Sequence, residues 1–256
     1  MKLAGTTFIR NGVQYDYSFK ETILSLLECC DHVFVVEAGS DDGTAEILNT
    51  LPSENLTIIT RTKQEWDGQK GTGYAKLCYF TDIAIQAARE AGYEYHLYVQ
   101  CDEIIHEKSY PFIREAISMD APGYMIKRVN LWASPYYKLD VPVERLPCST
   151  DIIRLAKTDY KAHGDAESLA VPFADISYLN QIRIYHNGFV RKREVMINKI
   201  KNMQQGVFEM IDYDKKLDQC EMFDPYLWFS KEDLKLIDEP LPKLMQEWAR
   251  ERVYED

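Results

Sequence analysis

One segment restricts the fold of this chain more than any other: a short apolar run followed at once by a polar turn. Residues 33–36 (VFVV) are too few for a helix and rich in β-branched side chains, which favours a buried strand. Residues 39–43 (GSDDG) form a flexible polar turn, and Thr44 begins a helical pattern that runs through Leu48. A carboxylate at Glu37, a turn of small residues and a helix N-terminus therefore follow a strand. In α/β sheets, ligands bind at this end of the strands.

The pattern around this segment predicts an α/β domain. Residues 6–10 are typical of a first strand, and residues 15–30 carry apolar side chains at helical spacing before the strand at 33–36. Strand, helix and strand within about forty residues form a βαβ unit with a right-handed crossover. Residues 61–73 are polar and contain glycines, which indicates a solvated loop. Further expected elements are a helix over residues 74–91 and strands over residues 56–60, 97–99, 123–132, 151–157 and 181–188.

Composition and charge narrow the class of protein. A chain of 256 residues that is 46% hydrophobic and 28% charged is long enough for one large α/β domain or two small ones with a sizeable core. Its net charge of −11 argues against broad contact with nucleic-acid backbones, which rests on many Lys and Arg side chains. The same charge is compatible with an anionic nucleotide ligand, provided that a divalent cation, backbone amides or local basic residues accept it.

Several features of the sequence favour a cytoplasmic location. Residues 1–12 turn polar too early for a signal peptide, and no stretch approaches the ~20 apolar residues of a membrane span. The six cysteines form no CxxC pair, and Cys29 and Cys30 are adjacent. That usage is typical of buried thiols in a reducing compartment, and it favours neither disulfides nor a zinc site.

Residues 37–44 (EAGSDDGT) resemble the VVDDGSxDGT nucleotide-binding signature of family-2 glycosyltransferases with the GT-A fold. The GSDDGT part is kept, whereas the two acids before it are replaced by Glu and Ala. The resemblance implies a GT-A-like (Rossmann-like) α/β domain over residues 1–205, with a mixed, mostly parallel sheet flanked by helices. A helical C-terminal extension over residues 206–256 would follow it. As a short motif, the same segment also fits an ordinary strand–turn–helix connection.

The resemblance also implies a metal-dependent donor site. Residues 100–103 (QCDE) follow a predicted strand and match the position of the family's acidic DxD motif, with Gln100 in place of the first acid. One Asp, diphosphate oxygens and waters make a workable octahedral set for Mn²⁺ or Mg²⁺, so Asp102 is the expected metal ligand. His186 is the second ligand under the resemblance, whereas its pattern alone favours a hydrogen-bonded core histidine. Glu103 is expected to contact the acceptor or to support the metal ligand.

The donor implied by the resemblance is a nucleotide-diphosphate sugar, with a UDP-sugar as the first candidate. In the family, the acid at the position of Glu37 contacts the nucleobase. Lys70 and the basic residues 191–193 are candidates to hold the diphosphate, although basic residues at a helix start are equally compatible with a solvated surface. The full set of expected donor contacts is Thr7, Asn11, Glu37, Gly39, Ser40, Asp42, Lys70, Gln100, Arg191 and Arg193.

A base and an acceptor groove complete the expected site. In the family an acidic residue in the region of residues 163–168 takes the acceptor's proton, and Asp165 or Glu167 fills that role by resemblance. Their side chains point to opposite faces if the segment is extended, so only one of the two is expected to act. Trp132 and Tyr136 are candidates to stack on the acceptor, although such aromatic residues more often belong to a core. The acceptor class stays open between a glycan, a lipid-linked molecule, a protein and a modified base.

The C-terminal part adds patterns that lie outside the resemblance. Residues 196–218 are expected to be helical, and residues 222–229 (MFDPYLWF) form an aromatic cluster. Leu241, Met245 and Trp248 lie on one face of a last amphipathic helix. Three roles stay open for these elements: covering the acceptor site, forming a homodimer surface, or packing on the catalytic domain.

The expected activity is metal-dependent transfer of a sugar from the nucleotide donor to an acceptor hydroxyl, with inversion at the anomeric carbon carried over from the family. Two rivals remain. A nucleotidyltransferase needs a glycine-rich, basic loop after its first strand, and residues 8–15 (FIRNGVQY) are a poor candidate for one. A non-catalytic module that binds nucleotide or glycan is favoured by Gln100 and Ala38, which replace acids of the family signature.

Overall fold

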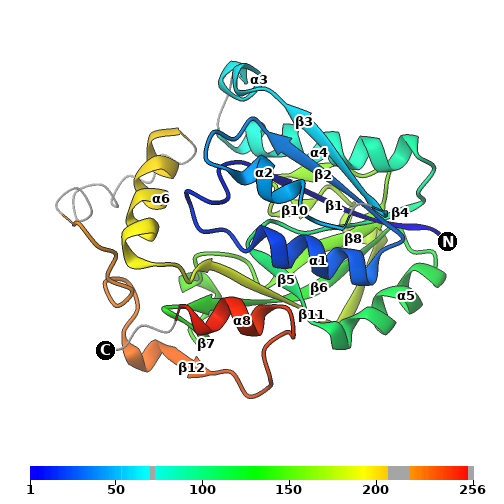
Figure 1. Cartoon of the computed structure of the whole chain (residues 1–256). Coiled ribbons are helices and arrows are strands. Elements are labelled where there is room, and N and C mark those ends of the chain that lie inside the picture. Colours follow the sequence, from blue (N-terminus) through cyan, green and yellow to red (C-terminus); the bar gives the residue numbers. More distant parts are fainter. Residues whose placement is uncertain (53, 70–72, 207–219, 253–256) are drawn as a thin grey trace.

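A mixed, ten-stranded β-sheet forms the centre of the molecule, and helices cover both of its faces (Figure 1). The computed structural model describes residues 1–52, 54–69, 73–206 and 220–252. No helix within these ranges is both long enough and apolar enough to cross a membrane. The strands are β1 (Leu3–Ile9), β2 (His32–Ala38), β3 (Leu56–Arg61), β4 (Tyr95–Tyr98), β5 (Glu103–Ile105), β6 (Gly123–Trp132), β7 (Ser134–Leu139), β8 (Asp151–Lys157), β9 (Ala162–His163), β10 (Ser168–Leu169), β11 (Ile176–Phe189) and β12 (Leu234–Leu236). The helices are α1 (Phe19–Cys29), α2 (Thr44–Leu48), α3 (Lys63–Gly68), α4 (Gly73–Glu90), α5 (Tyr110–Ser118), α6 (Arg193–Gly206) and α8 (Met245–Arg250), with short 3₁₀ turns η1 (Glu107–Ser109), η2 (Val143–Arg145), η3 (Phe173–Asp175) and η4 (Lys231–Asp233).

The strand order divides the sheet into a parallel and an antiparallel part. Strands β3, β2, β1 and β4 lie side by side and are all parallel, so their carboxyl ends share one edge. Beyond β4, strands β8, β6, β7 and β12 follow in antiparallel pairs. Strand β11 runs parallel to β6 and also pairs with β5, while β9 and β10 form a separate two-stranded sheet. This arrangement confirms the predicted mixed α/β fold.

Strand β2 is buried on both faces, which explains its unbroken apolar sequence. Val33 and Val35 pack into the core cluster that contains α1, whereas Phe34 and Val36 pack into the cluster beneath α4. Successive side chains of a strand point to opposite faces, so helices on both sides require apolar residues at every position. Strand β1, helix α1 and strand β2 form the predicted βαβ unit.

The predictions for the first helix and for residues 61–73 differ from the structure. The first helix begins at Phe19 because residues 11–17 form a loop rather than its first turn. The polar segment over residues 61–73 was expected to be a loop, but it contains α3. Thr62 is the N-cap residue of this helix, and its hydroxyl accepts a hydrogen bond from Glu65 N at 3.1 Å. This side-chain cap satisfies a backbone N–H that the first turn of a helix leaves free.

The described part of the C-terminal extension contributes a strand as well as a helix. Strand β12 pairs with β7 and so extends the sheet at its antiparallel end. Met245 and Trp248 of α8 are buried in a cluster with side chains of β6 and β11, so this apolar face packs on the chain's own sheet. Helix α6 is described as far as Gly206. The remainder of the helix predicted up to residue 218 lies outside the described residues.

Candidate functional site

Two loops meet at the carboxyl ends of β1 and β2, and hydrogen bonds tie them together. Asn11 N donates to Ser40 Oγ at 2.9 Å, and Asn11 Nδ2 donates to Asp41 Oδ1 at 3.0 Å. Gln14 N donates to Asp42 Oδ2 at 2.6 Å. The predicted donor residues Asn11, Ser40 and Asp42 therefore lie together, where the loop after β1 meets the turn before α2.

Within the turn, Glu37 and Gly39 have defined structural tasks. Glu37 is buried at the end of β2, and its Oε1 accepts a hydrogen bond from Ser40 N at 2.6 Å. Gly39 has a φ of +72°, and a Cβ at this position would lie 2.4 Å from Lys63 N at the start of α3. Only glycine satisfies both the left-handed backbone and this close approach.

Strand β1 brings two further side chains toward this edge. Thr7 is buried, and its Oγ1 lies 3.3 Å from Cys101 Sγ, in the turn after β4. Arg10 follows the strand, and its NH1 donates to Gly39 O at 2.5 Å. Arg10 therefore fixes the backbone of the turn from the opposite loop. The predicted donor residue Lys70 lies outside the described residues.

The turn after β4 carries Asp102 into a second cluster, which is nearly closed to solvent. Asp102 is 6% exposed, and its Oδ2 accepts from Arg191 NH2 at 3.0 Å and from Lys199 Nζ at 3.4 Å. Its Oδ1 lies 3.9 Å from His186 Nε2. Burial alone would raise the pKa of this carboxyl, but the charges of Lys199 and Arg191 outweigh burial and hold the pKa well below its usual range. Asp102 is therefore ionised.

His186 enters this cluster from β11, directly opposite Asn130 of β6. His186 Nδ1 lies 3.0 Å from Asn130 Oδ1, and Asn130 Nδ2 donates to the Cys148 carbonyl at 3.0 Å. Because the amide nitrogen is used in this way, the amide oxygen accepts from His186 Nδ1–H. Burial lowers the pKa of His186 to about 4, so the ring is neutral near pH 7 and its Nε2 lone pair faces Asp102.

The atoms that face each other here fit a divalent metal ion. A carboxylate oxygen and a neutral imidazole nitrogen are both metal ligands, and Asn130 orients the His186 ring as the outer partner of a metal ligand does. Gly188 packs directly against both side chains, because a Cβ there would lie 2.4 Å from His186 Nε2 and 3.4 Å from Asp102 Oδ2. The described part of the chain contains no group of three or more His, Cys, Asp and Glu side chains suited to a metal. The protein would thus offer two ligands.

Arg191 lies in this cluster, where it binds the protein's own atoms. Its NH1 donates to the carbonyls of Tyr15 and Asp16 at 2.7 Å each, and its NH2 donates to Asp102. Its guanidinium lies 4.2 Å from the ring centre of Tyr17. The side chain is fully buried. Arg191 therefore connects the loop after β1 with the carboxylate of the second cluster.

Lys199 of α6 is the second cation on Asp102. Its ammonium also donates to Gly188 O at 3.1 Å, and burial lowers its pKa to about 8. An ammonium group carries three N–H donors, and besides these two acceptors the ammonium lies 5.1 Å from the ring centre of Tyr17. Arg193, which was predicted to hold the donor, begins the same helix, but its Nε donates to Phe223 O of the C-terminal segment at 2.7 Å.

Glu103 follows Asp102 in the sequence but lies in a different environment. It is fully buried, and its Oε1 accepts from Arg154 NH2 at 2.6 Å and from Arg128 NH1 at 3.3 Å. Its Oε2 accepts from Gln100 N at 2.8 Å. The predicted acceptor contact is thus enclosed by the protein's own cations. Gln100, which replaces the first acid of the family motif, supports Glu103 through its backbone.

The two candidate bases lie in a turn between β9 and β10, and their surroundings differ. The Glu167 carboxylate accepts hydrogen bonds from Arg128 and from Ser149 Oγ, the latter at 3.0 Å. Burial raises the pKa of Glu167, but the charge of Arg128 outweighs burial, so the pKa is lowered. Asp165 accepts from Glu167 N at 3.1 Å, and burial together with the charge of Glu167 raises the pKa of Asp165. Ala166 between them has a φ of 61°, so the segment is not extended and the predicted alternation of faces does not apply. The surroundings of Asp165 therefore favour its protonated form, whereas those of Glu167 favour its ionised form.

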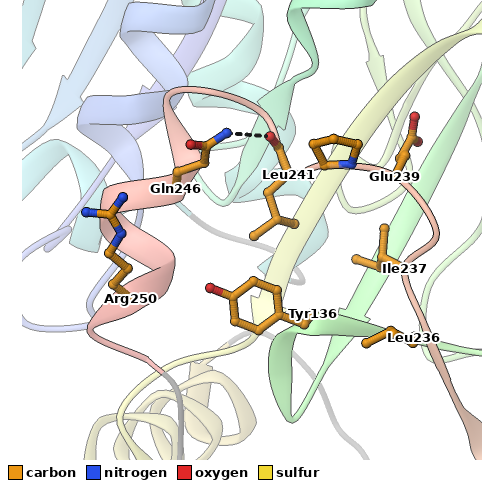
Figure 2. Close-up of a pocket in the computed structure, with 8 residues that line it drawn as sticks. Tyr136, Leu236, Ile237, Glu239, Leu241, Gln246 and Arg250 are labelled. Atoms are coloured by element: carbon orange, nitrogen blue, oxygen red, sulfur yellow. Dashed lines mark hydrogen bonds between the residues drawn. The ribbon is translucent and has the colours of Figure 1, made fainter.

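The two aromatic acceptor candidates lie in different places. Trp132 is fully buried, and its Nε1 donates to Pro225 O at 2.7 Å, so its ring is part of the core. Tyr136 is 37% exposed and lines a pocket of about 450 Å³ formed by the end of β7, the segment after β12 and α8. Figure 2 shows the Tyr136 ring and the Leu241 side chain facing each other across this pocket, with Gln246 hydrogen-bonded to Leu241 O at 3.2 Å. None of the residues that line this pocket belongs to the Asp102 cluster.

No protein-family model matches the sequence, and no curated protein matches it. Solved structures of TarS from S. aureus are similar to this chain. The 1–349 fragment of TarS is 16% identical with a TM-score of 0.47, and the similarity covers 81% of this chain and 67% of the fragment. The same fragment in complex with UDP-GlcNAc gives 16% identity and a TM-score of 0.46. In a longer TarS structure, with 15% identity and a TM-score of 0.46, the chain spans 40% of the length.

Arg10, Asn130 and Lys199 are among the side chains of these clusters that were not selected from the sequence. Asn130 interrupts the apolar pattern of β6, Lys199 lies among buried positions of α6, and Arg10 directly follows β1. A polar residue at a buried position needs a hydrogen-bonding partner, so this pattern was an available signal for Asn130 and Lys199. Their partners come from distant elements, which the pattern alone does not name.

Proposed function

We propose that this protein transfers a sugar from a nucleotide-diphosphate donor, with a UDP-sugar as first candidate, to an acceptor hydroxyl. The observation that carries the proposal is the pairing of Asp102 Oδ1 with His186 Nε2, which lie 3.9 Å apart with Gly188 packed against them. An ionised carboxylate, a neutral imidazole and the buried ammonium of Lys199 together suit a diphosphate whose charge is neutralised locally. The turn over residues 39–44 lies at the same edge of the sheet, where the parallel strands have their carboxyl ends. It therefore supports a nucleotide site next to this cluster.

The proposed mechanism divides the work among a few residues. Asp102 and His186 would hold a Mn²⁺ or Mg²⁺ ion, which when bound supplies positive charge for the departing diphosphate. Lys199 offers its remaining N–H to a diphosphate oxygen, while Arg191 keeps Asp102 ionised and in place. Asp165 accepts the proton of the acceptor hydroxyl. The hydroxyl oxygen attacks the anomeric carbon from the face opposite the diphosphate, whose bond breaks, so the configuration inverts.

A nucleotide- or glycan-binding module without catalysis is the second candidate function. It is favoured by Gln100 and Ala38, which replace acids of the family signature. The Gln100 side chain donates to Ala166 O at 3.4 Å and so takes part in the protein's own network. A module of this kind binds the nucleotide but does not break the bond between the sugar and the diphosphate.

The test combines donor binding with donor turnover. UDP-GlcNAc, UDP-glucose and GDP-, dTDP- and CMP-linked sugars are titrated by calorimetry, each with Mn²⁺ and with EDTA. We expect one donor to bind with Mn²⁺ and to stabilise the fold by about 2.7 kcal/mol at 100 times its Kd. Release of free nucleotide from that donor would support the transferase. Binding without any release would support the module, and no binding of any donor would contradict the transferase and a nucleotide-binding module.

Two variants tie the result to this cluster. Asp102→Asn removes the charge, and Gly188→Ala places a methyl group against His186 Nε2 without removing a charge. We expect both to lose Mn²⁺-dependent donor binding. Asp175→Ala, which changes an exposed acid in η3, is the matched control and should bind like the natural chain. Donor binding that persists unchanged in both site variants would rule out this cluster as the metal and diphosphate site.

A further inference from the structure

The end of the described chain reaches back to the loop after the first strand. Arg252, two residues beyond α8, forms a two-pronged ion pair with Asp16: its Nε donates to Asp16 Oδ2 at 3.0 Å, and its NH2 donates to Oδ1. The two side chains are only 7% and 17% exposed. Guanidinium–carboxylate pairs of this geometry are strong and directional, and here solvent screens them little.

Arg252 is itself held by α8. Its NH1 donates to the Trp248 carbonyl at 2.8 Å, and its guanidinium lies 4.3 Å from the ring centre of Trp248. Trp248 is buried in the cluster that joins α8 to β6 and β11. The position of the guanidinium is therefore set by the packing of a helix on the sheet, and it serves as a fixed point for Asp16.

On the other side, Asp16 leads directly to the candidate site. Its backbone has a φ of 51°, the left-handed region that Asp tolerates better than most residues. Its carbonyl and that of Tyr15 accept from Arg191 NH1, and Arg191 NH2 donates to Asp102. A continuous series of hydrogen bonds thus runs from α8 through Arg252, Asp16 and Arg191 to the carboxylate that faces His186.

We infer that Arg252 is a positioning residue for the donor site. It fixes the side chain of Asp16, which holds the Tyr15 and Asp16 carbonyls where Arg191 needs them, and Arg191 in turn fixes Asp102. The C-terminal helix, which lies outside the nucleotide-binding half of the sheet, thereby sets the geometry of the metal and diphosphate ligands. The role in donor binding rests on the function proposed above, whereas the effect on the loop does not.

The first experiment measures the loop itself by hydrogen exchange. The amides of Tyr15, Asp16 and Tyr17 donate within the loop, to Asn11 O, Val13 O and Gly12 O, so their exchange rates report whether the loop stays closed. Arg252→Ala should speed exchange at these three amides by about tenfold while the amides of β1 and β2 keep their rates. Arg250→Ala, which changes the exposed last residue of α8, should change neither.

The second experiment measures donor affinity in a double-mutant cycle. With Mn²⁺ present, Arg252→Ala and Asp16→Asn should each weaken binding of the donor by about tenfold, the size expected when the support of a metal ligand is lost. The double variant should be no weaker than either single one, because both changes remove the same pair. Arg252→Lys, which keeps the charge but loses the two-pronged geometry, should fall between the natural chain and Arg252→Ala.

The outcomes separate this inference from the proposed function. One outcome is faster loop exchange in Arg252→Ala while neither the natural chain nor any variant binds a donor. It would support the effect of Arg252 on the loop and reject the transferase. Unchanged loop exchange in Arg252→Ala would overturn the inference even if donors bind. Faster exchange throughout the sheet, together with a lowered Tm, would also overturn it, since Arg252 would then support the whole fold rather than this loop.

Discussion

Asp102 and Glu103 stand side by side in the sequence, but they meet different partners in the fold. Asp102 has one oxygen on Arg191 and Lys199 and the other facing His186. Glu103 has both oxygens committed to protein donors and no exposed surface. A pair of acids after a strand does not predict which of them will be enclosed. That is decided by cations that arrive from other strands and from α6.

Glu103→Gln should therefore be a stability variant. Replacing the carboxylate by an amide leaves Arg154 and Arg128 buried without their common counter-charge, and breaking a buried ion pair in this way costs about 3 kcal/mol or more. Urea unfolding measures the change. Glu144→Gln in η2, where the side chain is exposed, is the matched control and should stay within about 0.5 kcal/mol of the natural chain. Equal stabilities of the two variants would show that Glu103 is not held as described.

Asp165 and Glu167 should separate in a kinetic comparison. Asp165→Asn removes the proposed base, so turnover should fall by ~100-fold or more while donor affinity is kept. Glu167→Gln instead removes a partner of Arg128 and should lower stability more than turnover. The pKa of Asp165 is raised. The apparent pKa on the acid limb of the pH–rate profile should therefore lie above the ordinary Asp pKa of about 3.9. A larger turnover loss in Glu167→Gln would reverse the assignment.

Among the elements, those that depend on local patterns were predictable and those that depend on partners were not. The βαβ unit and the strands over residues 123–132 and 151–157 follow from apolar spacing; the structure has the two strands at those positions and the βαβ unit with shifted ends. Helix α3 was missed because its polar sequence resembles a loop. The local feature that favours a helix there is the Thr62 side-chain cap. Strand β12 was missed because three residues carry no periodic signal, and it exists only as an addition to β7.

The contact between the turn after β2 and α3 gives a prediction at this scale. Gly39→Ala would push a Cβ against Lys63 N, an atom of the helix backbone that cannot move aside. Gly43→Ala, in the same turn and also at positive φ, meets no atom within 4 Å. The control should therefore cost only the strain of the left-handed backbone, about 1–2 kcal/mol. Gly39→Ala should cost about 2 kcal/mol more than that by urea unfolding; equal costs would mean that α3 does not press on the turn.

For the molecule as a whole, the sequence located the elements of the candidate site better than its contacts. Residues 37–44 and Asp102 could be selected because they lie at the ends of recognisable strands and resemble family motifs, whereas His186 was selected through the resemblance alone. The hydrogen bonds around them could not be predicted, because the contacts of Asn130, Arg191 and Lys199 depend on how β6, β11 and α6 are placed around the turn after β4. Residues far apart in a chain acquire a common function only through the sheet order, which apolar spacing does not encode.

The Asp16–Arg252 pair also bears on how the chain is made in the cell. The two residues are 236 positions apart, so at a synthesis rate of about 5–20 residues per second Asp16 waits roughly 10 to 50 s for its partner. The four parallel strands are all synthesised by residue 98, well before Arg191, Lys199 and Arg252. The nascent chain can therefore build the parallel part of its sheet while still on the ribosome. Its ligand cluster can close only after the last of these residues has emerged.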